Sequence, residues 1–84
     1  MDDEKILCNN INYRKGFIEI LPNIHPKLIN IEITNIHPDY NLSILENLPD
    51  EAYAGNAEIE LSIQEAKELI RRLNLAILRT HIGN

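Results

Sequence analysis

The segment Ser62–Thr80, SIQEAKELIRRLNLAILRT, constrains the fold more than any other part of this 84-residue sequence. Ser62 is a good N-cap because its hydroxyl accepts from a backbone N–H of the first turn, and Glu65 three residues later completes a capping box. No glycine or proline follows until Gly83. Because apolar residues recur at helical spacing, the segment predicts one amphipathic C-terminal helix.

Apolar residues lie on two sides of this helix. Those that recur three or four positions apart form one face that we expect to be core; this helix stripe is Ala66, Leu69, Ile70, Leu73 and Ile77. At about 100° per residue, three more project from the opposite side; this helix ridge is Leu75, Leu78 and Ile82. The C-terminal half is thus apolar nearly all round, which indicates burial by its own chain and by a partner.

Short strands are predicted upstream of the helix. Within 27–36, three isoleucines at positions 29, 31 and 33 alternate with polar residues, as in a sheet with one wet face. Weaker patterns predict strands over 5–13, 17–21, 41–45 and 57–61, with a loop over 48–56. The sequence therefore predicts one α+β domain, residues 1–84: an antiparallel sheet of four to five strands with one C-terminal helix packed on one face.

The first hairpin has two registers that turn statistics allow. A two-residue loop at Lys15-Gly16, with Gly16 at positive φ, sets Tyr13 opposite Ile18 and puts both apolar rows on one face. A three-residue loop with a glycine bulge sets Ile18 beside Asn12 instead. We expect the first register because it matches the faces.

Charge and cysteine content narrow the function classes. The net charge is −5, and residues 38–61 hold six acidic residues without lysine or arginine. This balance disfavours direct nucleic-acid binding and leaves a solvated surface, a site for a basic partner, or a mimic of nucleic-acid charge. Cys8 is the one cysteine, which indicates a reducing compartment. The acidic N-terminus precedes no long apolar run, so we expect a cytoplasmic protein without membrane association.

Candidate catalytic and metal residues are sparse. The tetrapeptide Asn-Ile-His-Pro occurs at 23–26 and 35–38 and flanks the predicted strand 27–36. Its two histidines, His25 and His37, are then roughly 30 Å apart, too far to share a metal. Cys8 has no glycine-rich elbow or helix N-terminus beside it, and no phosphate-binding loop occurs. We therefore expect no enzyme activity, no metal and no cofactor.

The helix also carries the one cationic cluster. Arg71, Arg72 and Arg79 either pair with the acidic segment 38–61 or hold a small anion or nucleotide phosphate, with Tyr40 or Tyr53 stacking on a base. An 84-residue chain offers little concavity, so such a site needs two subunits.

These observations favour a small non-catalytic homo-oligomeric binding protein of the inhibitor or adaptor type. It would occupy a partner protein or sequester a ligand, and associate with itself through Leu75, Leu78 and Ile82 as a dimer or higher oligomer. Two alternatives stay open. One is a small-anion or nucleotide-binding protein that uses interface arginines, and the other is an acidic nucleic-acid mimic.

Overall fold

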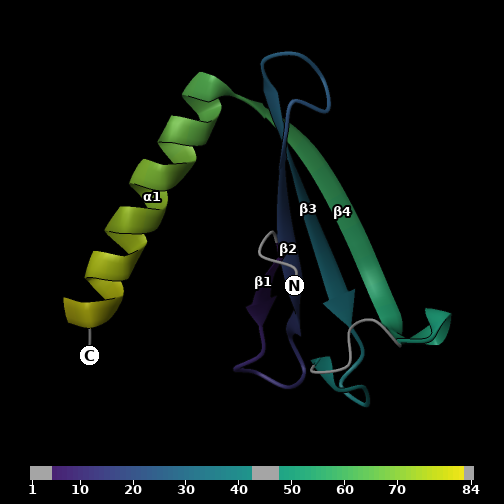
Figure 1. Ribbon diagram of the computed structural model, residues 1–84. Coiled ribbons are helices and arrows are strands. Elements are labelled where there is room, and N and C mark those ends of the chain that lie inside the picture. Colours follow the sequence, from purple (N-terminus) through teal and green to yellow (C-terminus); the bar gives the residue numbers. More distant parts are fainter. Residues whose placement is uncertain (1–4, 43–47, 83–84) are drawn as a thin grey trace.

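The computed structural model describes residues 5–42 and 48–82. Their elements in chain order are β1 (Lys5–Cys8), β2 (Lys15–Pro22), β3 (Leu28–Ile36), the 3-10 turn η2 (Asp50–Ala52), β4 (Tyr53–Ser62) and α1 (Ile63–Ile82). The described strands form one antiparallel sheet in the order β1-β2-β3-β4, and α1 stands on one side of it (Figure 1). The predicted α+β architecture, an antiparallel sheet with one C-terminal helix, is confirmed.

The strand register separates the residues of the sheet into two chemically different faces. Ile31 of β3 pairs with Ile20 of β2 and Ile59 of β4, so apolar side chains line up across the sheet. Successive side chains of a strand point to opposite faces. The isoleucine face is therefore Ile6, Ile18, Ile20, Ile29, Ile31, Ile33, Ile59 and Leu61, and the opposite glutamate face includes Glu19, Glu32, Glu58 and Glu60.

The first hairpin differs from both sequence registers. Cys8 pairs with Gly16 and Ile6 pairs with Ile18, so residues 9–14 form the connection and the predicted two-residue loop at Lys15-Gly16 is wrong. Lys15 and Gly16 belong to β2, which pairs with β3 over eight residues. That long ladder, rather than the turn, sets the register of β2. The predicted partner of Ile18, Tyr13, lies outside the strands, and Ile6 shares the face of Ile18 instead.

Gly16 is required for a different reason from the predicted positive φ. Neither of the described glycines, Gly16 and Gly55, has a positive φ, but a Cβ on Gly16 would lie 1.8 Å from the backbone oxygen of Thr34 in the neighbouring strand. Only a residue without a side chain allows β2 and β3 to approach this closely.

The segment between β3 and β4 was predicted less well. Tyr53–Asn56, expected as loop, belongs to β4, which is ten residues long. Of the strand predicted over 41–45, Asn41 and Leu42 are not in a strand, and residues 43–45 lie outside the described residues. A backbone hydrogen bond joins the residue after β3 to the residue before β4: His37 N–H donates to the Ala52 carbonyl at 2.8 Å.

The buried core lies on the glutamate face, at the end of the sheet where described residues of the segments 37–42 and 48–52 pack against it. It consists of Phe17, Ile36, Leu42 and Ala52, with Tyr40 and Leu48 packed against it. Lys15 is buried beside this core, and its ammonium donates to Asn12 Oδ1 at 3.0 Å and to the Pro38 carbonyl at 3.1 Å. The prediction that the core lies between the isoleucine face and the helix stripe is wrong within the described chain.

The start of α1 follows the sequence prediction. Glu65 N–H donates to Ser62 Oγ at 3.1 Å, and Ser62 N–H donates to Glu65 Oε1 at 2.9 Å, which is the reciprocal capping box. The helix stripe, however, is not buried: Leu73 is 53% exposed and Ile77 is 56% exposed. The capping box fixes where the helix starts, whereas burial of its stripe needs a surface packed against it.

The shape of the molecule is correspondingly open. The Cα radius of gyration is 14.8 Å, whereas a compact domain of this length has about 12 Å. The accessible surface is 6787 Å² for a 9.7 kDa chain, whereas a compact protein of that mass exposes about 5,100 Å². The chain therefore exposes roughly 1,700 Å² more than its size requires.

Candidate self-association surface

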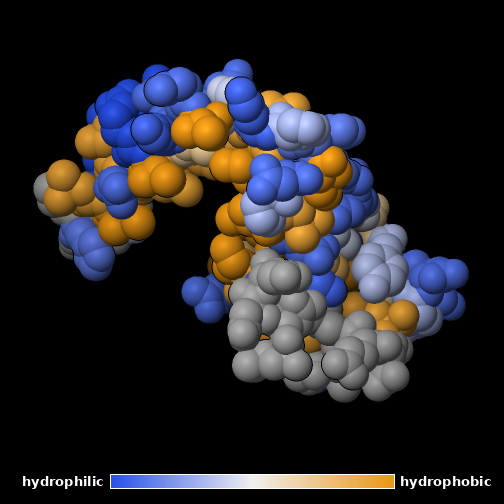
Figure 2. Space-filling model, turned by 45° about the horizontal axis from the view of Figure 1, so that its top comes forward, coloured by the Kyte–Doolittle hydropathy of each residue, from blue (hydrophilic) through white to orange (hydrophobic). Residues whose placement is uncertain are grey.

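A groove separates α1 from the sheet, and hydrophobic side chains line both of its walls (Figure 2). The helix stripe forms one wall. Its first residue, Ala66, is half-buried near the end of β4, while Leu69, Ile70, Leu73 and Ile77 are exposed. The isoleucine face forms the other wall. Ile33 and Ile59, which lie on it, are 43% and 61% exposed.

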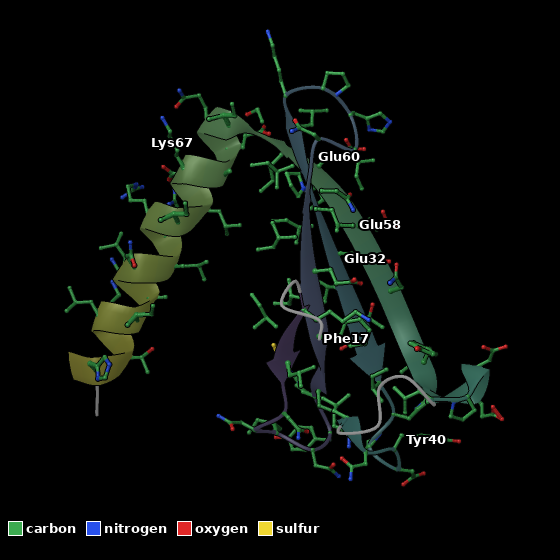
Figure 3. All side chains as sticks on the ribbon, in the orientation of Figure 1. Phe17, Glu32, Tyr40, Glu58, Glu60 and Lys67 are labelled. Carbon is green, nitrogen blue, oxygen red and sulfur yellow. The ribbon has the colours of Figure 1, made fainter. Side chains whose placement is uncertain are left out.

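The carboxylates of the sheet point away from this groove. Figure 3 shows Glu32, Glu58 and Glu60 on the side of the sheet that faces away from α1. Glu32 lies between Glu19 and Glu58 in the register, and like charges directly opposite each other destabilise a sheet. Neutral amides lie among these carboxylates: Asn56 Nδ2 donates to Glu32 Oε2 at 3.0 Å, and Asn30 Nδ2 donates to Glu58 Oε1 at 3.4 Å. The polar and apolar surfaces are thus sorted onto opposite faces.

The helix ridge lies on the side of α1 opposite the groove. Leu78 is 54% exposed, and the side chain of Ile82 lies outside the described part of the chain. Leu75 is half-buried. Its i−4 and i+4 neighbours are Arg71 and Arg79, and side chains at this spacing lie next to each other on a helix. The structure therefore leaves apolar side chains uncovered on two sides of the C-terminal half of α1.

Two of the three predicted anion-binding arginines have a partner within the helix. Arg71 Nη2 and Arg72 Nε each donate to Glu68 Oε2 at 2.7 Å, and Arg71 Nε donates to Glu68 Oε1 at 3.1 Å. Hydrogen bonds from Arg71 and then Arg72 lower the pKa of Glu68 from 4.5 to about 2. An anion at these arginines has to compete with a carboxylate that is already in place.

The two tyrosines of the predicted anion site lie elsewhere. Tyr40 packs against the buried core at the end of the sheet (Figure 3), and Tyr53 begins β4, ten residues before α1. One chain therefore does not bring them to the arginines. A site that combines them would need a second copy.

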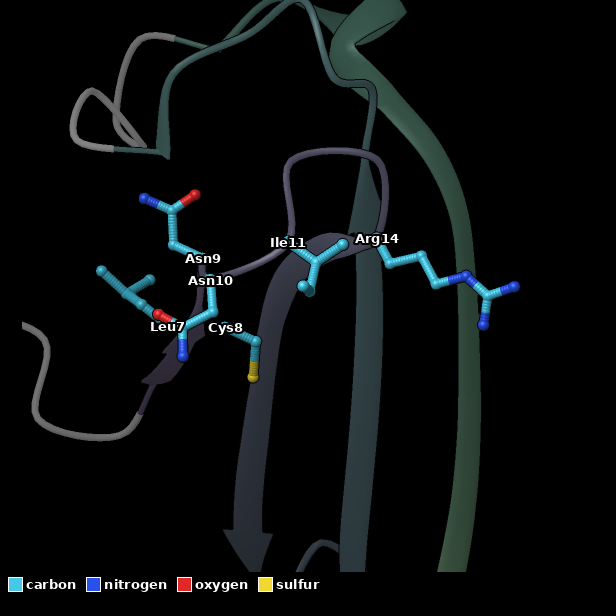
Figure 4. A pocket seen from close by; sticks show the side chains of 6 residues that line it. All are labelled: Leu7, Cys8, Asn9, Asn10, Ile11 and Arg14. Carbon is cyan, nitrogen blue, oxygen red and sulfur yellow. The ribbon is translucent and has the colours of Figure 1, made fainter. Parts of the chain in front are cut away.

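A depression of about 370 Å³ lies at the β1–β2 connection (Figure 4). It is lined by Leu7, Cys8, Asn9, Asn10, Ile11 and Arg14. The exposed Cys8 thiol lies 3.7 Å from the Ile6 carbonyl, and the Arg14 side chain extends away from Leu7 and Asn9. These lining residues include no carboxylate and no histidine to act as a general base.

The two histidines of the repeated tetrapeptide, His25 and His37, lie at opposite ends of β3. His25 Nδ1 lies 2.7 Å from Glu60 Oε1, while the backbone of His37 starts the segment that covers the core. Among residues 5–42 and 48–82, no group of three or more histidine, cysteine or acidic side chains is placed to hold a metal ion. In the same residues, no helix has the length and apolar composition needed to cross a bilayer.

The sequence predicted the apolar residues of the groove but not that they are uncovered. The alternation at 29–33 and the stripe on the helix are both visible in the sequence. The sequence feature that could have indicated their exposure is at Leu61 and Ser62, where the strand pattern is followed directly by the helix N-cap with no loop residues between them. β4 ends at Ser62 and α1 begins at Ile63.

Fold and surface together define a small α+β protein with an uncovered apolar groove. Comparison with protein-family models, curated proteins and solved structures finds no match for this chain. The properties of the groove and of α1 are therefore the basis on which a function is proposed.

Proposed function

We propose that this chain is a small non-catalytic binding protein that works in the cytoplasm as a homo-oligomer. It occupies a partner protein or sequesters a ligand. The observation that carries the proposal is the exposure of apolar side chains on two sides of α1, with Leu73 and Leu78 both more than half exposed. Monomeric proteins rarely expose continuous apolar patches beyond a few hundred Å², and larger ones mark interaction sites.

Self-association is the simplest use of such a helix. Every copy of the chain presents the same surface, and a two-fold axis lets one surface cover its equivalent. The ion pairs of Arg71 and Arg72 with Glu68 support a structural role for this part of α1, because they satisfy the charges within the helix. The described side chains that line the depression at Cys8 include no carboxylate and no histidine, which supports a role without nucleophilic chemistry.

Light scattering tests the oligomer. We expect the wild-type protein to have a mass of at least twice 9.7 kDa, and the variant Leu75→Glu with Leu78→Glu to be a folded monomer. The matched control, Gln64→Glu with Asn74→Glu, adds the same charge at exposed polar positions of α1 and should stay oligomeric. A wild-type monomer at high micromolar concentration would show that self-association is wrong.

Native mass spectrometry of protein purified from its host tests the binding role. A protein bound in fixed stoichiometry to the oligomer supports occupation of a partner, and a bound small molecule supports sequestration. A bound nucleotide that is lost in Arg79→Gln would favour the arginine-based alternative.

A further inference from the structure

The groove between α1 and the sheet has no charged residue on either wall. The helix stripe is entirely apolar, and so is the isoleucine face. The other positions that share this face of the sheet are also uncharged: Cys8, Gly16, Pro22, Asn35, Gly55 and Ala57. Water in such a groove would cover apolar surface on both sides, which is unfavourable in proportion to the area. The groove therefore fits an apolar occupant.

The surface that the whole chain exposes in excess is large enough for the interface of a stable dimer. The chain exposes roughly 1,700 Å² more than a compact protein of its mass. Two copies that bury this excess against each other would remove about 3,400 Å² in total, within the range of obligate homodimers. A small ligand would bury only part of it.

The helix of the same chain is poorly placed to close the groove. Connections between strands and helices usually contain two to six residues, but β4 ends at Ser62 and α1 begins at Ile63. The capping box holds this junction, because Ser62 and Glu65 in the first turn of α1 make two reciprocal hydrogen bonds. Without a linker that can bend, α1 stays away from its own sheet, and short connections of this kind favour exchange between copies.

We propose that the occupant is α1 of a second copy of this chain, in a reciprocal two-fold arrangement. The inference rests on the self-association proposed above and specifies where the helix goes. An occupant must be apolar on two opposite sides, and the C-terminal half of α1 has Leu73 and Ile77 on one side and Leu75 and Leu78 on the other. In the ribbon view, α1 diverges from the sheet toward this same C-terminal end (Figure 1).

The arrangement gives four layers: sheet, helix, helix and sheet. Each helix then lies between the helix and the isoleucine face of the other copy. The two helix stripes face each other in the middle, and each helix ridge faces the other sheet. This placement covers both apolar sides of α1, which a contact through the ridge alone does not do.

The charges of α1 are compatible with this placement. Glu68, Arg71 and Arg72 lie in its N-terminal half, and both arginines pair with Glu68. They therefore bring no unpaired charge into the layered contact. Arg79 is the one lysine or arginine of the C-terminal half, and its long aliphatic stem lets the guanidinium reach solvent at the rim.

Thiol accessibility tests the proposal on two neighbouring residues of β4. In a Cys8→Ser background, Ile59→Cys places a thiol on the groove wall and Glu58→Cys places one on the opposite face. We expect a maleimide to modify residue 59 about tenfold or more slowly than residue 58 in concentrated protein. The difference should disappear on dilution to the monomer, because the protecting helix belongs to another chain.

The outcomes show whether the proposed self-association, the placement of α1 in the groove, or both are wrong. A dimer by light scattering with residue 59 as reactive as residue 58 means that self-association stands and that the groove is empty, which overturns this inference alone. A monomer overturns the proposed function and this inference together. Protection of residue 59 that does not depend on protein concentration means that the helix of the same chain closes the groove, which also overturns the inference.

A second measurement does not depend on a variant in the groove. One chain carries Cys8→Ser and His81→Cys, has a spin label on residue 81 and contains no isotope label. It is mixed with isotope-labelled wild-type chains. We expect the label to broaden the amide signals of β2 and β3 in the labelled copy, and to spare them when a chain with Leu75→Glu and Leu78→Glu carries the label. Broadening confined to α1 of the labelled copy would contradict the proposal.

Discussion

Lys15 shows how a single residue completes the small core of this chain. Its side chain is buried, and its ammonium joins Asn12 of the β1–β2 connection to the Pro38 carbonyl that follows β3. A buried lysine is tolerated where its donors are paired, because an unpaired buried polar group costs stability. The residue therefore ties the first hairpin to the segment that covers Phe17.

Replacing Lys15 by methionine removes these donors and keeps the length of the side chain. We expect Lys15→Met to lower the free energy of unfolding by about 1–3 kcal/mol, because two acceptors lose their partner. Lys27→Met, at an exposed turn position, is the control and should change it by less than about 0.5 kcal/mol. Equal urea midpoints for the two variants would show that the Lys15 contacts contribute nothing.

Glu68 makes the stability of α1 depend on pH. Hydrogen bonds from Arg71 and Arg72 lower its pKa in the folded protein to about 2, from 4.5. A lowered pKa means that the stabilisation is fully present above pH 4.5 and is lost as the pH falls through about 2. Glu68→Gln removes the charge, so its melting temperature should lie below that of the wild type at neutral pH.

The difference between the two proteins should close as the pH is lowered through that window. Circular dichroism melts across the acid range measure it. In a background with Arg71→Gln and Arg72→Gln, the Glu68→Gln substitution should have no such pH-dependent effect, because the partners are gone. A difference that persists unchanged at the lowest pH would mean that the ion pairs are not its cause.

The junction of β4 and α1 is the decisive feature at the scale of secondary structure. Local rules set both elements: side-chain alternation makes β4 a strand, and the capping box starts α1 at Ile63. Because no residue separates them, the direction of α1 is tied to the direction of β4. The junction thus determines which chain can cover which sheet.

A flexible insertion at this junction should change the assembly. We expect Gly-Ser-Gly between Leu61 and Ser62, which keeps the capping box intact, to give a folded monomer, because α1 then reaches the isoleucine face of its own chain. The same insertion between Asn10 and Ile11, in the β1–β2 connection, should leave the oligomer unchanged. Light scattering distinguishes the two, and an oligomer with the junction insertion would contradict the role assigned to the junction.

At the scale of the whole molecule, association should add to the stability of the folded chain. The described chain buries a core around four residues, Phe17, Ile36, Leu42 and Ala52, while its larger apolar faces remain open. Small domains often need oligomerisation because one small core supplies little stability. The second copy would supply the missing part of the core.

The melting temperature should therefore rise with protein concentration. For a dimer that unfolds to single chains, each tenfold increase in concentration adds about 1.4 kcal/mol per dimer to the apparent stability. Thermal melts of the wild type at two concentrations measure the effect, and the variant with Leu75→Glu and Leu78→Glu should not show it. A concentration-independent melt of the wild type would mean that each chain is stable alone.

The sequence by itself determined the features that depend on neighbouring residues. The capping box at Ser62 and Glu65 located the start of α1, and the alternation over 29–33 identified β3 and its two faces. The α+β class follows from these patterns. Each depends on spacings of a few residues, where backbone geometry decides which side chains share a face.

Only the tertiary structure decided the register of the first hairpin, the position of the core and the separation of α1 from the sheet. Gly16 pairs with Cys8 because the ladder between β2 and β3 overrides the preference of the turn. The core formed on the glutamate face because Leu42 and Ala52 pack there against Phe17 and Ile36, a contact that no local pattern shows. The helix stripe is exposed because its burial depends on contacts between residues distant in the sequence, and periodicity identifies an apolar face without identifying the surface that covers it.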